Sequence, residues 1–185
     1  MSITTIILII AAVLIVIIIG IYNGLVRARV RMREALSDID VQSKRRFDLV
    51  PNLVETVKGY MTQERTILEN VTKARTAVMQ SSGTPLEKAD MENQFTGALK
   101  TLFAVSEQYP NLKSNMNFLE LQRELEDTEN KMMAARRFYN STVQDLNTKI
   151  QTFPTSIIAG MFGFREEKFF EITASAEREP VKVKF

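Results

Sequence analysis

The first 26 residues, MSITTIILIIAAVLIVIIIGIYNGLV (1–26), carry no charged side chain. Between Ile3 and Ile21 there are 19 residues, of which 14 are Ile, Leu or Val. A helix of this length is about 28 Å long, close to the roughly 30 Å of hydrocarbon in a bilayer. Its apolar residues cover the whole circumference, whereas a buried helix of a soluble protein would need a polar or small face. Residues 1–26 are therefore predicted to form a transmembrane signal-anchor helix.

A cleaved signal peptide is the alternative interpretation of this segment. Such a peptide has a basic start, a shorter apolar run and a cleavage site of small residues. Here the residues before the apolar run, Ser2 to Thr5, are uncharged, and the run ends in Gly20-Ile21-Tyr22-Asn23. These features favour an uncleaved, single membrane-spanning helix.

Four arginines follow the apolar segment directly: Arg27, Arg29, Arg31 and Arg33. The other flank has no Lys or Arg, so the positive-inside rule places the amino terminus outside and the rest of the chain in the cytoplasm. On a continuing helix the arginines form two rows on roughly opposite sides, which suits contact with lipid head groups around the helix. Ordinary solvated charge is the alternative, and it explains Arg31 and Arg33 equally well.

The overall charge and the missing residue types exclude several functions. The chain has 24 basic and 22 acidic residues, a net charge of +2, which argues against a nucleic-acid partner bound by bulk charge. It has no Cys and no His, so thiolate catalysis, Ser–His triads and imidazole metal ligands are excluded. We therefore predict no catalytic residue, no metal site, no cofactor and no enzymatic activity.

The acidic residues of the chain are the remaining candidates for metal ligands. Glu120 with Glu124, and Glu126 with Glu129 or Asn130, have helical spacing. Dinuclear carboxylate centres in helical bundles usually also need His, and these rows alternate with Lys and Arg. Solvated helix faces are the favoured interpretation. A short basic run, Lys44-Arg45-Arg46, is likewise assigned to surface salt bridges or a partner contact.

Residues 27–152 are predicted to form a cytosolic bundle of long helices, so the fold class is all-α. Apolar residues recur at three-, four- or near-heptad spacing, as in antiparallel bundles and coiled coils. The expected helices run from the membrane to Val50, from Pro51 to about residue 80, from Pro85 to Tyr109, and from Asn117 to Ile150. Pro51 is taken as a helix boundary because proline disfavours the helical conformation of the preceding residue. Thr84-Pro85 with Glu87 predicts a capping box.

Residues 153–185 form an aromatic-rich tail, where helix signals stop after Pro154. Six of the eleven Phe residues lie in these 33 positions. Because an even number of helices returns the chain to the membrane, the tail is expected to begin near the lipid surface. It can pack on the bundle itself, enter the head-group region or contact another subunit. The residues proposed for lipid or partner contact are Phe162, Phe164, Phe169 and Phe170.

Several motifs, in order along nearly the whole chain, resemble the LemA family of bacterial membrane proteins. They are Tyr22-Asn23, Asp38-Ile39-Asp40-Val41, Arg45-Arg46-Phe47-Asp48-Leu49-Val50-Pro51-Asn52-Leu53-Val54, Thr56-Val57-Lys58-Gly59-Tyr60, Ala74-Arg75, Ala135-Arg136-Arg137-Phe138-Tyr139-Asn140, Phe153-Pro154 and Ala159-Gly160-Met161-Phe162-Gly163-Phe164. The resemblance implies a membrane helix and a cytosolic antiparallel helical bundle. It implies little about activity. Gln63 stands where a His is common in the family, which weakens any shared His-dependent role.

These observations lead to two functional hypotheses. The first is a non-enzymatic, LemA-like scaffold anchored by one helix at the cytoplasmic face of the bacterial inner membrane. Its expected partners are membrane lipid and copies of itself, in a homo-oligomer, or another membrane protein. The second is an adaptor or regulator of a membrane protease or signalling protein in envelope quality control. A carboxylate-only enzyme is a third, much weaker interpretation.

Overall fold

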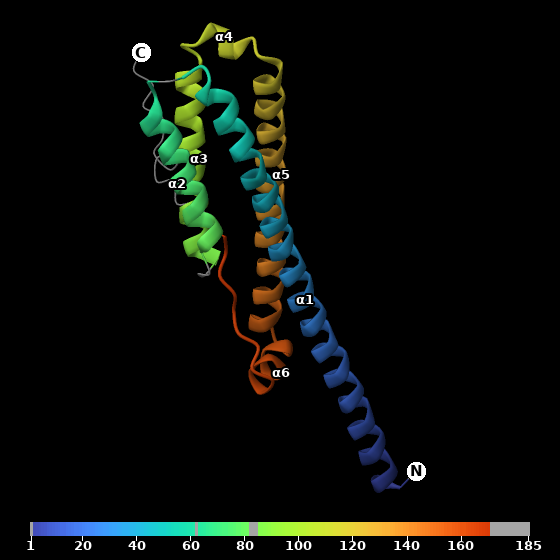
Figure 1. Cartoon of the computed structure of the whole chain (residues 1–185). Helices are drawn as coiled ribbons and strands as arrows, with labels where there is room; N and C mark the ends of the chain where they lie inside the picture. The colour runs from blue at the N-terminus through green and yellow to red at the C-terminus, as the bar shows by residue number, and fades with distance from the viewer. Residues whose placement is uncertain (1, 62, 82–84, 171–185) are drawn as a thin grey trace, which may run out of the picture. The chain divides into compact units, whose positions relative to one another are not determined.

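The computed structural model describes residues 2–61, 63–81 and 85–170, and all of its regular elements are helices (Figure 1). The elements are α1 (Ile3–Lys58), α2 (Arg65–Gln80), α3 (Pro85–Ser106), α4 (Pro110–Lys113), α5 (Met116–Gln151) and α6 (Thr155–Met161). The predicted fold class is confirmed: an apolar N-terminal helix continues into a bundle of long antiparallel helices, followed by an aromatic-rich tail.

The chain divides into two compact units. The anchor unit comprises Met1–Asp38 and Ala135–Phe169. The helical-core unit comprises Ile39–Ala134 together with Phe170–Phe185, of which 171–185 lie outside the described residues. Helices α1 and α5 each contribute to both units. The two units are described separately below.

Helix α1 passes through Pro51 without ending, so the predicted boundary at Val50 is wrong. Proline lacks an N–H and leaves the carbonyl four residues earlier, that of Phe47, without its helical donor. The Nε of Arg75 on α2 donates to this carbonyl oxygen at 2.8 Å. The expected second helix is therefore divided, its first turns belonging to α1 and its remainder to α2.

The helical-core unit is held together by one apolar cluster. Phe47 of α1 packs edge-on against Phe95 of α3, with ring centroids 5.3 Å apart. At the other end, Phe103 and Phe118 have centroids 6.1 Å apart. The buried members of the cluster are Phe47, Val50, Leu53, Val57, Met61, Leu68, Val71, Val78, Phe95, Leu99, Leu102, Leu112, Phe118 and Leu125. Burial of each large apolar side chain contributes about 1.5–3 kcal/mol to folding.

The starts of α3 and α5 differ in how well they were predicted. Helix α3 begins at Pro85 as expected, while its predicted cap, Thr84, lies outside the described residues. Before α5, the Oδ1 of Asn115 accepts a hydrogen bond from the Phe118 N–H at 3.1 Å. Asn115 is therefore the capping residue, and α5 begins at Met116, one residue before the start expected from the sequence. The short helix α4 was not expected.

The anchor unit contains a helix that the sequence did not predict. Helix α6 follows Pro154, and it ends in a Schellman motif: the Phe164 N–H donates to the Ala159 carbonyl at 2.9 Å, and Gly163 has a φ of +69°. This turn directs the ring of Phe164 onto a small buried cluster with Leu25 and Ala159. The part of the tail around Ala159 and Phe164 therefore packs on α1 within this unit.

Candidate functional site

The apolar segment of α1 is long and hydrophobic enough to cross a membrane. None of its most apolar 18-residue window is buried within the described structure. A core helix of a soluble protein would have buried a face of this window against other helices. The exposed Ile, Leu and Val side chains therefore match the lipid environment predicted for residues 1–26.

The four arginines after this segment occupy two kinds of surroundings. Arg27, Arg31 and Arg33 are exposed to solvent, as head-group contact would require. Arg29 is half-buried, and its guanidinium carbon lies 3.9 Å from the centroid of the Phe164 ring. Such a cation–π contact is worth about 0.5–2 kcal/mol. Arg29 therefore fastens the tail to α1, and head-group contact remains a prediction for all four arginines.

The four Phe residues proposed for lipid or partner contact differ in their exposure. Phe164 and Phe170 are buried, whereas Phe162 and Phe169 are exposed. Tyr22, at the end of the apolar run, lies close to two of these rings. Its ring centroid is 4.8 Å from that of Phe162 and 6.0 Å from that of Phe164. Tyr22 was missed as a site residue, although tyrosine at the end of a membrane helix is typical of the interface.

The segment after α6 is tied to α5 by polar contacts. The Asn147 side chain donates to the Glu167 carbonyl and accepts from the Glu167 N–H, both at 2.9 Å. The Tyr139 hydroxyl donates to the Lys168 carbonyl at 3.1 Å. Burial of Tyr139, followed by the Glu167 carboxylate, raises the pKa of this phenol above its ordinary value of 10.0. These contacts fix the backbone of residues 167–168.

The helical-core unit contains a buried charge cluster that crosses three helices. Arg46 of α1 is 3% exposed, and its Nη1 lies 2.7 Å from Oε2 of Glu129 on α5 and 3.8 Å from Oε2 of Glu92 on α3. The same nitrogen donates to Thr96 at 3.0 Å, and Ser43 donates to Glu92. The prediction that Arg46 belongs to a surface patch is therefore wrong, while Lys44 and Arg45 are exposed.

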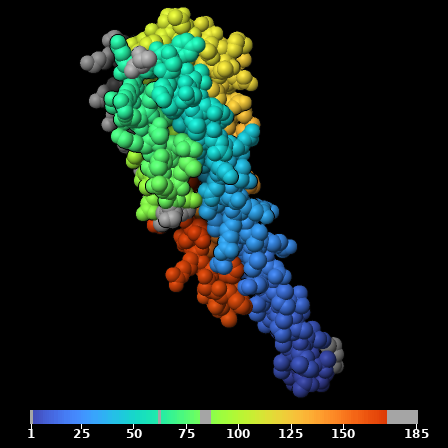
Figure 2. All heavy atoms as spheres, in the orientation of Figure 1, coloured from blue at the N-terminus to red at the C-terminus, as the bar shows by residue number. Residues whose placement is uncertain are grey.

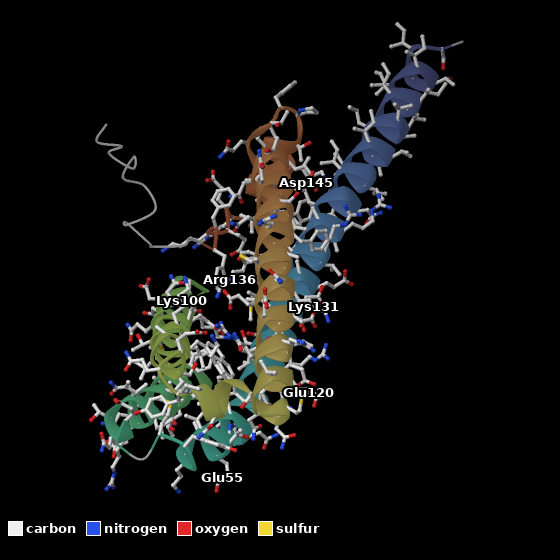
Figure 3. The ribbon with its side chains drawn as sticks, turned by 90° about the horizontal axis from the view of Figure 1, so that it is seen from above. Glu55, Lys100, Glu120, Lys131, Arg136 and Asp145 are labelled. Carbon is white, nitrogen blue, oxygen red and sulfur yellow. The ribbon has the colours of Figure 1, made fainter. Side chains whose placement is uncertain are left out.

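The other predicted acidic rows lie at the surface of the helical-core unit. Glu120 and Glu124 of α5 line an open depression of about 440 Å³ together with Glu55 of α1, and Figure 3 shows Glu55 and Glu120 at the same end of the unit. Glu126 and Asn130 line a smaller cavity of about 250 Å³ beside Arg46 and Glu129. Within the described ranges, no group of three carboxylates is arranged to hold a metal ion.

Comparison with known proteins connects this architecture to a family. The sequence pattern of the LemA family matches residues 35–185. The chain belongs to the LemA family. The resemblance read from the sequence motifs is thereby confirmed, and the match includes the bundle and the tail that packs on α1.

Among the similar proteins, one bears the name LemA and others are magnetosome proteins. Protein LemA of Metamycoplasma hominis is 29% identical over 144 residues, which are 76% of this chain and 64% of the relative. Magnetosome protein MamQ 1 of Paramagnetospirillum magneticum is 24% identical over 175 residues, 81% of the chain and 64% of the relative. Magnetosome protein MamQ of Magnetospirillum gryphiswaldense is 23% identical over 174 residues, 80% of the chain and 64% of the relative. The matches thus span slightly less than two thirds of each relative.

Together, the family match and the exposed apolar helix indicate the general class of this protein. It is a membrane-associated helical protein of the LemA family. None of the relatives named above bears the name of an enzyme.

Proposed function

We propose that this chain is a non-enzymatic scaffold, anchored by one membrane helix, whose helical core lies at the cytoplasmic face of the bacterial inner membrane. There it holds copies of itself or another membrane protein. The observation that carries this proposal is the continuity of α1, which runs from Ile3 to Lys58 as one helix. The membrane segment and the first helix of the core are therefore one element, with no linker between them.

Continuity of α1 favours a scaffold over a domain on a flexible linker. A flexible linker lets a domain search for substrates, whereas a helix holds its backbone through hydrogen bonds between successive turns. The helix continues across 27–38, the stretch that contains the four arginines, and five of its turns beyond Asp38 belong to the core. This arrangement supports a role in holding partners at the membrane surface.

Two surfaces can supply contacts between copies. Gly20 and Gly24 are four residues apart on α1, and a Cβ added at either would meet no atom within 4 Å. Small residues at this spacing let two membrane helices approach closely. The second surface is a charged face of α5 in the helical-core unit, where exposed Lys131 and Asp127 form an ion pair.

Chemical cross-linking in native membranes tests the proposal. A scaffold that assembles with itself gives a ladder at multiples of the 21.1 kDa chain. A one-to-one product with another membrane protein, formed without any homo-oligomer, would favour the adaptor hypothesis instead. The Gly24→Leu variant separates assembly through the membrane helix, which it would abolish, from assembly through the core. A chain that stays monomeric and unlinked at native expression would contradict the scaffold proposal.

A further inference from the structure

Helix α6 exposes an apolar row that the rest of the anchor unit does not cover. Ile157 and Met161 are four residues apart, which places them on one face of α6, and Phe153 lies in the turn just before this helix. With the adjacent Phe162, these side chains are between 52% and 77% exposed. The opposite side of α6 is also apolar, because Ile158 and Ala159 are buried. A short helix that is apolar on both sides needs a second nonpolar environment.

The position of α6 in the anchor unit identifies that environment. Phe162 packs on Tyr22, the residue that directly follows the apolar run Ile3–Ile21. Ile21, Leu25 and Val26 pack with the segment around Phe164. Figure 2 shows the atoms of this segment, in red, against the blue atoms of α1. The row on α6 therefore lies beside the point where α1 leaves the hydrocarbon.

Charged groups near α6 also suit a lipid surface. Arg27, Arg31 and Arg33 are exposed on the turns of α1 that follow Tyr22. Arg165 and Lys168 are exposed just after α6, on either side of the exposed Glu166 and Glu167. Aromatic and basic residues together are typical of segments in the head-group region, where apolar side chains reach the acyl boundary and cations meet phosphates.

We propose that α6 is an interfacial helix that inserts its exposed row into the leaflet from which α1 emerges. The lipid surface covers Phe153, Ile157, Met161 and Phe162, while Phe164 and Arg29 lock the segment to α1. The anchor unit then has two attachments to the same leaflet, a spanning helix and a helix in the interface. This inference rests on the membrane anchoring of the proposed function and is independent of self-assembly.

The absence of Trp from the chain allows a direct test. Ile157→Trp and Met161→Trp each introduce one fluorophore into the full-length chain, reconstituted in vesicles of anionic phospholipid with or without brominated acyl chains. Phe138→Trp is the matched control, because Phe138 is an exposed aromatic residue on α5 of the same unit, about 20 Å of helix rise before the end of α5. Circular dichroism verifies that each variant keeps its helicity.

The expected result is at least a twofold loss of fluorescence in brominated vesicles for both α6 variants, with little change for Phe138→Trp. Equal quenching of all three, or none at α6, would overturn the proposal. Blue-shifted but unquenched α6 emission would also overturn it, because protein and not lipid would then cover the row. Val13→Trp, within the spanning segment, separates the failures: if it is quenched while α6 is not, membrane anchoring stands and only the interfacial helix is rejected.

Discussion

The Nε of Arg75 on α2 donates a hydrogen bond to the carbonyl oxygen of Phe47 on α1 at 2.8 Å. That carbonyl lies four residues before Pro51, which has no N–H to offer it. A buried carbonyl without a donor costs about 1–3 kcal/mol. Arg75 therefore compensates for the proline and lets α1 continue for two more turns to Lys58.

Replacement of Arg75 tests this compensation. We expect Arg75→Leu to lower the free energy of unfolding by about 1–2 kcal/mol, measured by chemical denaturation of the detergent-solubilised chain. Arg65→Leu is the control, since Arg65 forms an exposed pair with Glu69 on the same helix and should contribute under about 0.5 kcal/mol. In a Pro51→Ala background the N–H of residue 51 can donate to the Phe47 carbonyl. The loss of unfolding free energy caused by Arg75→Leu should therefore be smaller in that background. An equal loss in both backgrounds would show that Arg75 does not compensate for the proline.

The buried charge cluster gives a second prediction. Arg46→Leu leaves the carboxylates of Glu92 and Glu129 without this cation, and breaking a buried pair in this way costs about 3–5 kcal/mol. Arg45→Leu removes an exposed neighbour on the same turn and should change stability by less than about 0.5 kcal/mol. Thermal unfolding followed by circular dichroism compares the two variants. Similar melting temperatures would mean that Arg46 has little structural role.

The start of α5 provides a third prediction. Asn115→Ala removes the side-chain acceptor for the Phe118 N–H and should cost about 1 kcal/mol. It also removes the hydrogen bond from Asn115 to the Tyr60 hydroxyl, at 3.0 Å, which joins α5 to the turn after α1. Asn117→Ala, at an exposed position inside the helix, is expected to be neutral or slightly stabilising. A larger loss for Asn117→Ala in denaturant titrations would contradict the assignment of Asn115 as the cap.

The raised pKa of Tyr139 predicts a loss of stability in alkali. The unfolded chain releases the phenolic proton near pH 10, while the folded chain holds it to higher pH because of burial and Glu167. The contribution is full below about pH 10, and the free energy of unfolding falls as pH rises between the unfolded and folded pKa values. Tyr139→Phe should remove this part of the alkaline decline. Denaturation curves from pH 8 to 11 that coincide in shape for both chains would refute it.

Much of the fold follows from sequence patterns, because long helices with regular apolar spacing must bury one face. The buried residues Leu25, Ala28, Met32, Ala35 and Ile39 show this spacing on α1. Pro51 misled the prediction since local propensity cannot report a donor such as Arg75, which is 24 positions away in the sequence. The hydrogen bond between Arg75 and the Phe47 carbonyl forms only when the chain folds.

The candidate site was predicted less completely. Arg46 was assigned to surface salt bridges or a partner contact because of its charge, yet it is buried, as is Arg136. Burial of a charge depends on which helices its face meets, and periodicity does not give that information. Helix α6 was missed because it is only seven residues long and its buried and exposed sides are both apolar. No amphipathic contrast therefore marked it, although the four-residue steps from Phe153 to Met161 were visible.

We propose that one helix holds the core at the cytoplasmic face of the membrane. Because the chain contains no Cys, single substitutions provide unique labels. Ser2→Cys precedes the apolar segment, and Ser37→Cys lies at an exposed position on α1 beyond the arginines. In spheroplasts treated with a membrane-impermeant maleimide, we predict that Ser2→Cys reacts at once and Ser37→Cys reacts only after permeabilisation. Reaction of Ser37→Cys in intact spheroplasts, with Ser2→Cys protected, would contradict the account.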